Sequence, residues 1–210
     1  MLWIVVTSPV FLSDEATFLH RLLANGVDII HLRKPGASAA DCARLLEELS
    51  AEDRSHIVVH DFFELAEPYG LRGIHLNAHR NIVPEGYSGH VSRSCHSLEE
   101  VKQHKDNCNY VFLSPIFDSV SKQGYASAFT DATLRQASEQ GILDNKVVAL
   151  GGVTPDKIHY LKSLNFGGAA MLGCINSMAG LSEAQLCARL HSIRAVSYTH
   201  LRAHETVLDL

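Results

Sequence analysis

The stretch VVALGGVTPD at residues 147–156 contains one complete repeating unit of an α/β fold. It begins with a short apolar run that does not alternate between polar and apolar residues, which is typical of parallel strands buried on both faces. Two glycines follow, and Thr154-Pro155 then places an N-cap residue before a proline at the first helical position. The stretch therefore predicts a strand, a tight turn and a helix in direct succession.

Similar units recur along the chain on both sides of this stretch. Strands are expected at 2–7, 28–32, 56–60, 73–76, 90–94, 110–113, 147–150 and 169–172. Helices with start signals lie between them, including one after Ser13-Asp14-Glu15, one opened by a capping box at Ser97 and a last one over 181–196. Eight strands alternating with about eight helices predict an α/β protein, a single-domain (β/α)8 TIM barrel with a parallel eight-stranded sheet.

An open, doubly wound parallel sheet is the alternative architecture. That fold usually carries a Gly-x-Gly-x-x-Gly turn after its first strand, and the corresponding turn here is TSPV at residues 7–10. The barrel is therefore the favoured fold.

Composition narrows the class of protein. With 46% hydrophobic residues and 18 basic against 23 acidic side chains, the 210-residue chain is too apolar for disorder and too acidic for a nucleic-acid surface. No apolar run reaches membrane-spanning length, and the N-terminus lacks the features of a secretory signal. The five cysteines are scattered and odd in number, which is typical of reduced thiols. We expect a cytoplasmic protein without a nucleic-acid or membrane partner.

Candidate functional residues follow the carboxyl ends of the strands, where TIM barrels place their active sites. Gly151 and Gly152 follow the seventh strand and Gly173 follows the eighth, so backbone amides there can approach a phosphate closely. On their own, Gly151-Gly152 are equally consistent with a tight turn. Arg33 and Lys34 follow the second strand and suit an anion.

The 13 histidines suggest acid/base chemistry, but position separates them. His96, just after the fifth strand, is the best candidate for a general acid or base because imidazole titrates near neutral pH. His75 lies within an apolar strand and is expected to be a hydrogen-bonded barrel residue. No two histidines have the local spacing of a zinc site, so we expect no histidine metal site. Asp61 alone offers thin support for a magnesium site.

Several motifs in one order resemble the thiamine-phosphate synthase/TenI family, over roughly residues 1–196. These are HLRK (31–34), HD (60–61) with ELA (64–66), GIHL (73–76), SCHSLEEV (94–101), SPIF (114–117), SVSK (119–122) and ALGGVTPD (149–156). The resemblance implies the same (β/α)8 barrel and a role in thiamine biosynthesis.

Two activities occur in that family. The synthase joins hydroxymethylpyrimidine diphosphate to thiazole phosphate with loss of pyrophosphate, assisted by Mg²⁺. The TenI branch includes a thiazole tautomerase, which aromatises a thiazole carboxylate phosphate by proton transfer and needs no cofactor. The expected partners are thus thiazole phosphate and, for a synthase, the pyrimidine diphosphate. Family members are often dimeric, which leaves a homodimer open.

Site residues carry over by matching motifs. The resemblance assigns substrate anions to Arg33, Lys34, His60, Ser94, Ser119, Ser121 and Lys122. It places the thiazole phosphate at Gly151, Gly152 and Gly173, and it makes Asp61 a magnesium ligand only if the chain is a synthase.

Departures from the synthase pattern favour the TenI branch. A synthase typically has a magnesium-binding Asp where this chain has Arg80 in HLNAHR (75–80), and a cation at a metal position repels Mg²⁺. His31 and Pro35 replace the Gln and a basic residue of the synthase motif, and His60 replaces the usual Asn. SCHSLEE (94–100), in contrast, resembles the TenI segment whose histidine transfers the proton, which makes His96 the predicted catalytic residue.

Three other possibilities stay open beside the tautomerase. They are the synthase itself, a non-catalytic phosphometabolite-binding regulator, and an unrelated phosphate-handling barrel, which would lack its expected acid pair or desolvated lysine. The barrel domain is expected at 1–196. The remainder, 197–210, looks like read-through of a non-native sequence and is left out of the functional reasoning.

Overall fold

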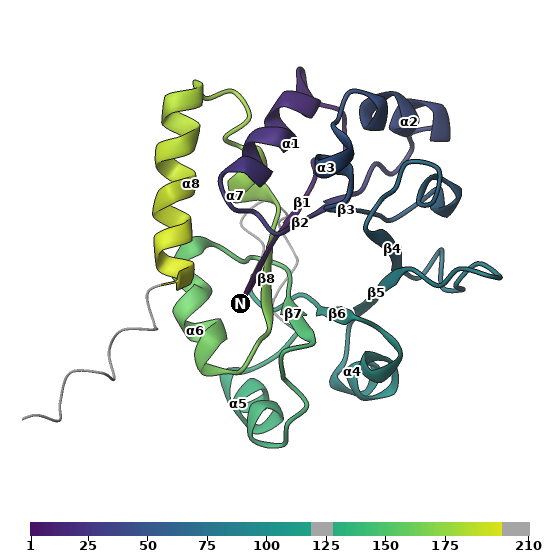
Figure 1. The fold of residues 1–210 in the computed structure, drawn as a ribbon. Helices are drawn as coiled ribbons and strands as arrows, with labels where there is room; N and C mark the ends of the chain where they lie inside the picture. Colours follow the sequence, from purple (N-terminus) through teal and green to yellow (C-terminus); the bar gives the residue numbers. More distant parts are fainter. Residues whose placement is uncertain (119–127, 199–210) are drawn as a thin grey trace, which may run out of the picture.

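Eight parallel strands form a closed barrel in the computed structural model, which describes residues 1–118 and 128–198 (Figure 1). Each strand pairs with the next along the chain, and β8 pairs with β1, so the (β/α)8 prediction is confirmed. The strands are β1 Leu2–Val6, β2 Ile29–Leu32, β3 Ile57–Val59, β4 Gly73–Leu76, β5 His90–Cys95, β6 Tyr110–Leu113, β7 Val147–Ala149 and β8 Gly168–Met171. Every expected strand is present, with ends within one residue of the prediction.

Both faces of the strands are apolar because each face packs against a different layer. Ile4 and Val6 of β1 point into the barrel, whereas Trp3 and Val5, which alternate with them along the strand, pack against the surrounding helices. The interior cluster contains Ile4, Val6, Ile29, Val58, Tyr110, Phe112, Val148 and Ala170. Burial on both sides explains why the strands appear in the sequence as continuous apolar runs.

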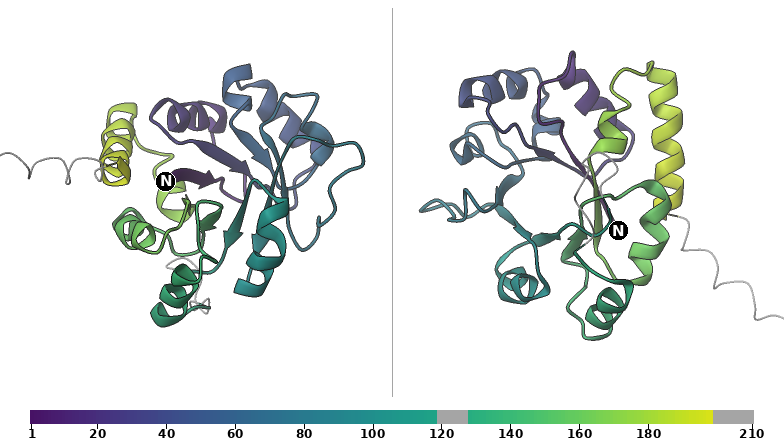
Figure 2. Two further views of the ribbon diagram at one scale, coloured as in Figure 1. Left: turned by 60° about the horizontal axis from the view of Figure 1, so that its bottom comes forward. Right: turned by 180° about the vertical axis from the view of Figure 1, so that it is seen from behind.

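Helices surround most of the barrel (Figures 1 and 2). They are α1 Glu15–Ala24, α2 Ala39–Glu47, α3 Ala51–Arg54, α4 Leu98–His104, α5 Asp131–Glu139, α6 Ile158–Ser163, α7 Gly173–Asn176 and α8 Glu183–Tyr198, with 3-10 turns η1 Phe63–Leu65, η2 Lys105–Asn107 and η3 Pro155–Lys157. The connection after β4, residues 77–89, contains no helix, and in Figure 1 it projects from the barrel as a loop. The layer of helices is therefore interrupted on this side, although the barrel of strands is closed.

Helices or helical turns begin where the sequence predicts, but the expected capping hydrogen bonds are not all present. The Ser97 side chain caps α4 by accepting from the Glu100 amide. Thr154 makes no cap bond, because its hydroxyl donates to Asp156 at 2.6 Å and a short 3-10 turn follows. Asp14, which precedes α1, has a left-handed backbone and no capping bond from its side chain.

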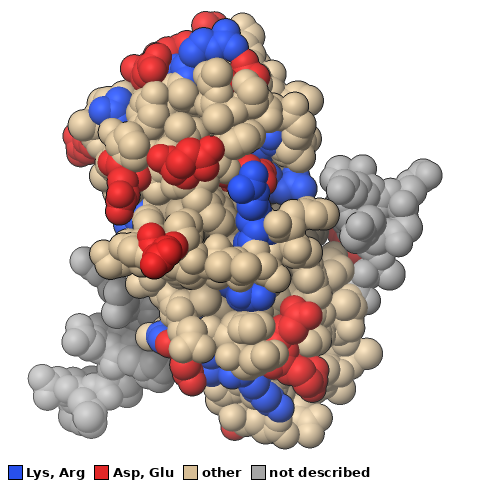
Figure 3. Space-filling model, turned by 90° about the vertical axis from the view of Figure 1, so that its right-hand side faces the viewer, with Lys and Arg blue, Asp and Glu red and all other residues tan. Residues whose placement is uncertain are grey.

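The C-terminal helix extends further than the sequence predicts. α8 continues through Tyr198, so the first two residues of the expected tail are helical, and 199–210 lie outside the described residues. Within the described part of the chain, no helix has the length and apolar character needed to cross a membrane. Figure 3 shows acidic and basic side chains interspersed on one face of the molecule.

Candidate active site

His96 lies where the sequence places the catalytic base, directly after β5 at the carboxyl end of the barrel. Its side chain is exposed, and its Nδ1 lies 3.1 Å from the Ser114 carbonyl oxygen and 3.3 Å from the Ser114 hydroxyl. The His96 amide donates to the Glu100 carboxylate at 2.7 Å, which ties this residue to the first turn of α4. Backbone and ring are thus held by two separate contacts.

The contact with Ser114 determines which ring nitrogen of His96 is basic. A carbonyl oxygen only accepts, so the bond requires a proton on Nδ1 of His96. In the neutral ring, Nε2 then carries the lone pair. An exposed Nε2 with an oriented ring can accept a proton from a substrate and return it.

The glycines after β7 are required by their backbone conformation and by close packing. Gly151 and Gly152 have φ of +92° and +62°, a region that favours glycine. A Cβ at Gly152 would lie 2.5 Å from the Asp118 carbonyl oxygen, and one at Gly151 would lie 2.8 Å from Cα of Pro115. Gly173 is the first residue of α7. A tight turn is therefore confirmed, and phosphate binding there stays a prediction.

The other predicted substrate contacts are only partly brought together. Arg33 is exposed, and its charge helps to lower the pKa of His60. The Ser94 hydroxyl is half-buried and lies 2.8 Å from Nε2 of His75. Ser119, Ser121 and Lys122 lie outside the described residues.

Asp61, the residue assigned to magnesium in a synthase, is half-buried beside the mouth of the barrel. Burial raises the pKa of Cys42 in α2 to about 11, and the negative charge of Asp61 adds to that shift. The Asp61 carboxylate is therefore close enough to α2 for its charge to affect the Cys42 thiol.

Lys34 does not fit the expected role of a substrate-binding cation. Its ammonium group is buried and donates to both carboxylate oxygens of Glu15, at 2.6 and 2.8 Å, and to the carbonyl oxygens of Ser8 and Val10, both at 2.9 Å. Burial lowers the pKa of Lys34, and the Glu15 carboxylate acts in the opposite direction. The charge is used within the fold, where it fastens the loop between β1 and α1 to β2.

A hydrogen-bonded group of polar side chains occupies one side of the barrel interior. Nδ1 of His31 lies 2.8 Å from Nε2 of His60, and Nε2 of His31 lies 2.5 Å from the Tyr110 hydroxyl. His75 lies between two hydroxyls, with Nδ1 2.8 Å from Ser92. The prediction that His75 is a hydrogen-bonded barrel residue is confirmed.

Burial keeps these imidazoles uncharged. It lowers the pKa of His60 to about 3, with the Arg33 charge adding to the effect, and it lowers the pKa values of His31 and His75 well below their usual range. His90, next to Tyr110, has its pKa lowered to about 4, again mainly by burial. Tyr110 is not among the predicted site residues, and the sequence singles out His31 only as a departure from the synthase motif. Because side chains alternate along β6, Tyr110 faces the barrel interior on the same side as Phe112, and this pattern could have indicated it.

Histidines that are far apart in the sequence nevertheless meet in the structure. The barrel brings His31, His60 and His75 together from three neighbouring strand ends, so the absence of a local zinc-type spacing does not exclude a histidine metal site. One ligand nitrogen from each lies within 4.8 Å of the others. Local spacing is therefore not a valid criterion in this fold.

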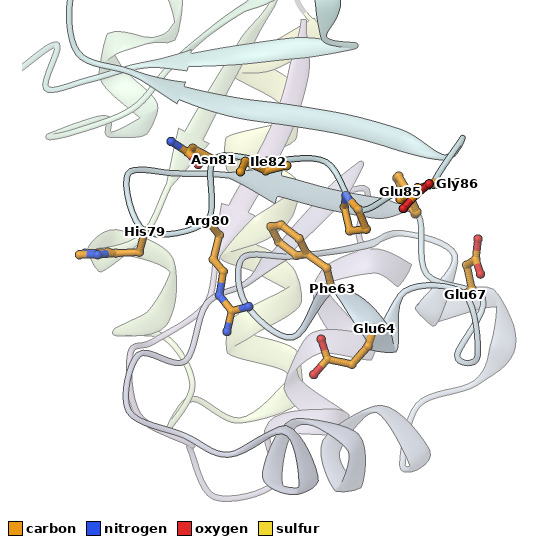
Figure 4. A pocket seen from close by; sticks show the side chains of 11 residues that line it. Phe63, Glu64, Glu67, His79, Arg80, Asn81, Ile82, Glu85 and Gly86 are labelled. Carbon is orange, nitrogen blue, oxygen red and sulfur yellow. The ribbon is translucent and has the colours of Figure 1, made fainter.

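A cavity of about 710 Å³ lies in the gap in the helical layer, between the segments after β3 and β4 (Figure 4). Arg80 projects into it beside Phe63 and Glu64, and His79 points away from them. Asn77 shapes this loop, since its side chain accepts from the Arg80 amide. His96 and the glycine turn do not line the cavity, so it is separate from the candidate base.

The fold and these groups together define a (β/α)8 barrel with an exposed histidine and a tight glycine turn at the carboxyl ends of its strands. Residues 2–175 match the thiamine monophosphate synthase family. The chain belongs to this family of enzymes of thiamine biosynthesis.

Individual relatives agree with this assignment. The chain is 24% identical to the thiamine-phosphate synthase of Halalkalibacterium halodurans, covering 86% of this chain and 88% of that protein. It is 26% identical to that of Methanoculleus marisnigri, with 92% and 93% covered. A crystal structure of thiamine phosphate pyrophosphorylase from Bacteroides thetaiotaomicron superposes with a TM-score of 0.84 at 39% identity, covering 94% of this chain and 98% of that one.

Proposed function

We propose that this chain acts on thiazole phosphate and that its reaction is the proton transfer of a thiazole tautomerase. The observation that carries the proposal is the bond between Nδ1 of His96 and the Ser114 carbonyl oxygen. In the neutral ring this bond leaves the lone pair on Nε2 of an exposed side chain, at the end of the barrel where TIM-barrel enzymes bind substrate.

The substrate is held by groups at the same end. Amide groups of the first turn at Gly173 bind the phosphate because they have no partner within the helix. Those of the Gly151-Gly152 turn contribute because glycine has no side chain to keep a ligand from the backbone. Arg33, exposed after β2, binds a carboxylate or phosphate oxygen.

The reaction then needs only one proton carrier. Nε2 of His96 takes a proton from one atom of the non-aromatic ring, and the resulting imidazolium keeps its Nδ1–H on the Ser114 carbonyl. The same Nε2 returns the proton to a second atom, so the ring becomes aromatic and no proton is consumed. General acid–base catalysis of this kind typically contributes 10²–10⁴-fold to the rate, as an order of magnitude.

A magnesium site of the synthase kind does not fit the residues present. Asp61 is one oxygen ligand, but Arg80 stands at the position of the second acid and brings a positive charge to this side of the mouth. No step is therefore assigned to Mg²⁺.

The synthase reaction is the second candidate, because the named relatives support it better than they support the tautomerase. In that reaction the cationic side chains of Arg33 and Arg80 would balance pyrophosphate charge.

A homodimer and a cytoplasmic location also stay predictions. Size-exclusion chromatography with light scattering tests whether the protein is a homodimer.

One comparison of substrates separates the candidates. Purified protein is incubated with the carboxythiazole phosphate tautomer, and in parallel with thiazole phosphate, pyrimidine diphosphate and Mg²⁺. Aromatisation that falls in His96→Gln supports the tautomerase, and magnesium-dependent thiamine phosphate formation overturns it in favour of the synthase. Thiazole phosphate binding without either turnover would identify a regulator.

A further inference from the structure

Three histidines from neighbouring strand ends meet beneath the mouth of the barrel. His31 lies on β2, His60 directly follows β3 and His75 lies on β4. All three are buried, and among the residues that the structure describes they are the one group in which three potential ligand atoms lie within 4.8 Å of one another. The proposed tautomerase does not use them.

The hydrogen bonds of the group suit imidazoles that bind a metal. A ligating histidine usually donates its second ring N–H to an oxygen that fixes the tautomer. His31 has that partner in the Tyr110 hydroxyl, 2.5 Å from its Nε2, which leaves Nδ1 facing Nε2 of His60. His75 has a hydroxyl beside each nitrogen, so one nitrogen can bind an ion while the other keeps its serine.

The spacing is close to that of a metal centre. Ring centroids lie 5.1 Å apart for His31 and His60, and 5.0 Å apart for His31 and His75. Zinc–nitrogen bonds of about 2.0–2.1 Å put two tetrahedral ligand nitrogens roughly 3.3 Å apart. The 2.8 Å between Nδ1 of His31 and Nε2 of His60 must therefore widen by about 0.5 Å, and an ion then replaces their hydrogen bond.

The rings of His60 and His75 define the movement that binding requires. They are stacked, with centroids 4.2 Å apart and an angle of 25° between their planes, so their lone pairs lie in separate, nearly parallel planes and one ring must turn for both to meet one ion. His60 directly follows β3, whereas His31 and His75 lie within strands, so His60 is the ring whose turning disturbs the strands least. Turning His60 lets all three nitrogens converge.

We propose that His31, His60 and His75 bind one divalent transition-metal ion of the zinc class at the base of the barrel mouth. Nitrogen-rich sites suit Zn²⁺, Co²⁺ and Ni²⁺ and disfavour Mg²⁺ and Ca²⁺. The ligands are neutral, as metal binding requires, and they leave the charge of the ion uncompensated. The open coordination positions therefore favour an anionic ligand from the mouth.

The test is a metal titration of the untagged full chain, because a histidine tag would bind the same ions. Co²⁺ is added and followed by its visible ligand-field absorption, Zn²⁺ is then added in competition, and bound metal is counted by mass spectrometry. We expect one equivalent of Co²⁺ in a tetrahedral-type spectrum, displaced by Zn²⁺, and a raised melting temperature. Mg²⁺ should produce none of these changes.

Variants locate the site. His60→Gln keeps a side chain that can hydrogen-bond to His31 and should weaken Co²⁺ binding by more than about 100-fold, whereas Tyr110→Phe should weaken it by about 10–100-fold. His191→Gln, at an exposed position on α8, is the matched control and should bind as the wild type does. Circular dichroism confirms that each variant is folded.

Two results overturn the proposal. One is the lack of saturable binding at one equivalent in the wild-type protein, which would make the group a hydrogen-bonded core. The other is unchanged affinity in folded His60→Gln. His96→Gln should retain full metal binding, so the metal proposal and the tautomerase proposal fail independently.

Discussion

Replacing Lys34 by methionine tests whether its charge serves the fold or the substrate. The ammonium group makes four hydrogen bonds of 2.6–2.9 Å, two to the Glu15 carboxylate and one each to the carbonyl oxygens of Ser8 and Val10. In the variant, the Leu12 amide at 3.1 Å is the one hydrogen-bond partner that the buried Glu15 carboxylate keeps among the residues that the structure describes. Both carbonyl groups also lose their donor.

The loss of stability expected in Lys34→Met follows from these contacts. Removing one partner of a buried ion pair typically costs about 3–5 kcal/mol, because the other charge stays buried without compensation. Single domains are stable by about 5–15 kcal/mol, so Lys34→Met should remove a large part of the free energy of unfolding. Urea denaturation followed by far-ultraviolet circular dichroism measures it.

A double variant separates the ion pair from simple loss of packing. Lys34→Met combined with Glu15→Leu removes both charges and should be more stable than Lys34→Met alone, since apolar replacement of a buried pair is often neutral. A loss below about 1 kcal/mol in Lys34→Met, together with greatly weakened substrate binding, would refute this reasoning. That result would instead support Lys34 as a cation that binds the substrate, as the sequence suggests.

Two further predictions concern the glycine turn and the buried histidines. Gly152→Ala should lower the free energy of unfolding by about 1–3 kcal/mol more than Gly141→Ala, as measured by urea denaturation. Both glycines have positive φ, but only at Gly152 would the new Cβ meet a carbonyl oxygen, that of Asp118. Equal losses would mean that the turn relaxes. The free energy of unfolding should fall as pH falls from about 6.5 toward the lowered pKa values of His60, about 3, and His90, about 4. The unfolded chain binds protons there that the folded one excludes, at up to about 1.4 kcal/mol per pH unit for each histidine. Urea midpoints at several pH values check this, and a smaller slope is expected in His60→Gln.

The barrel could be predicted because its signals are local. Each strand is a continuous apolar run between recognisable turns, and the structure departs from the strict alternation at 77–89, which contains no helix, and between β3 and β4, where only the short turn η1 is present. The position of His96 could be predicted for a similar reason, since it lies beside a strand end and a helix cap that the sequence shows directly, whereas its role as a base stays a prediction.

The remaining features depend on contacts between distant residues. Arg33 and Lys34 are adjacent cations in one loop, and only the position of Glu15 on α1 decides that the second is buried. Likewise, His31, His60 and His75 meet because the barrel aligns successive strands, and no local spacing records that alignment. The partner of Nδ1 in His96 is a carbonyl 18 residues away.

The proposed tautomerase is tested most directly by the rate at which the protein aromatises the carboxythiazole phosphate tautomer. We predict acceleration by the wild-type protein without added Mg²⁺ and a fall of about 10²–10⁴-fold in folded His96→Gln. No acceleration, or a rate in His96→Gln equal to that of the wild type, would contradict the assignment of His96 as the proton carrier.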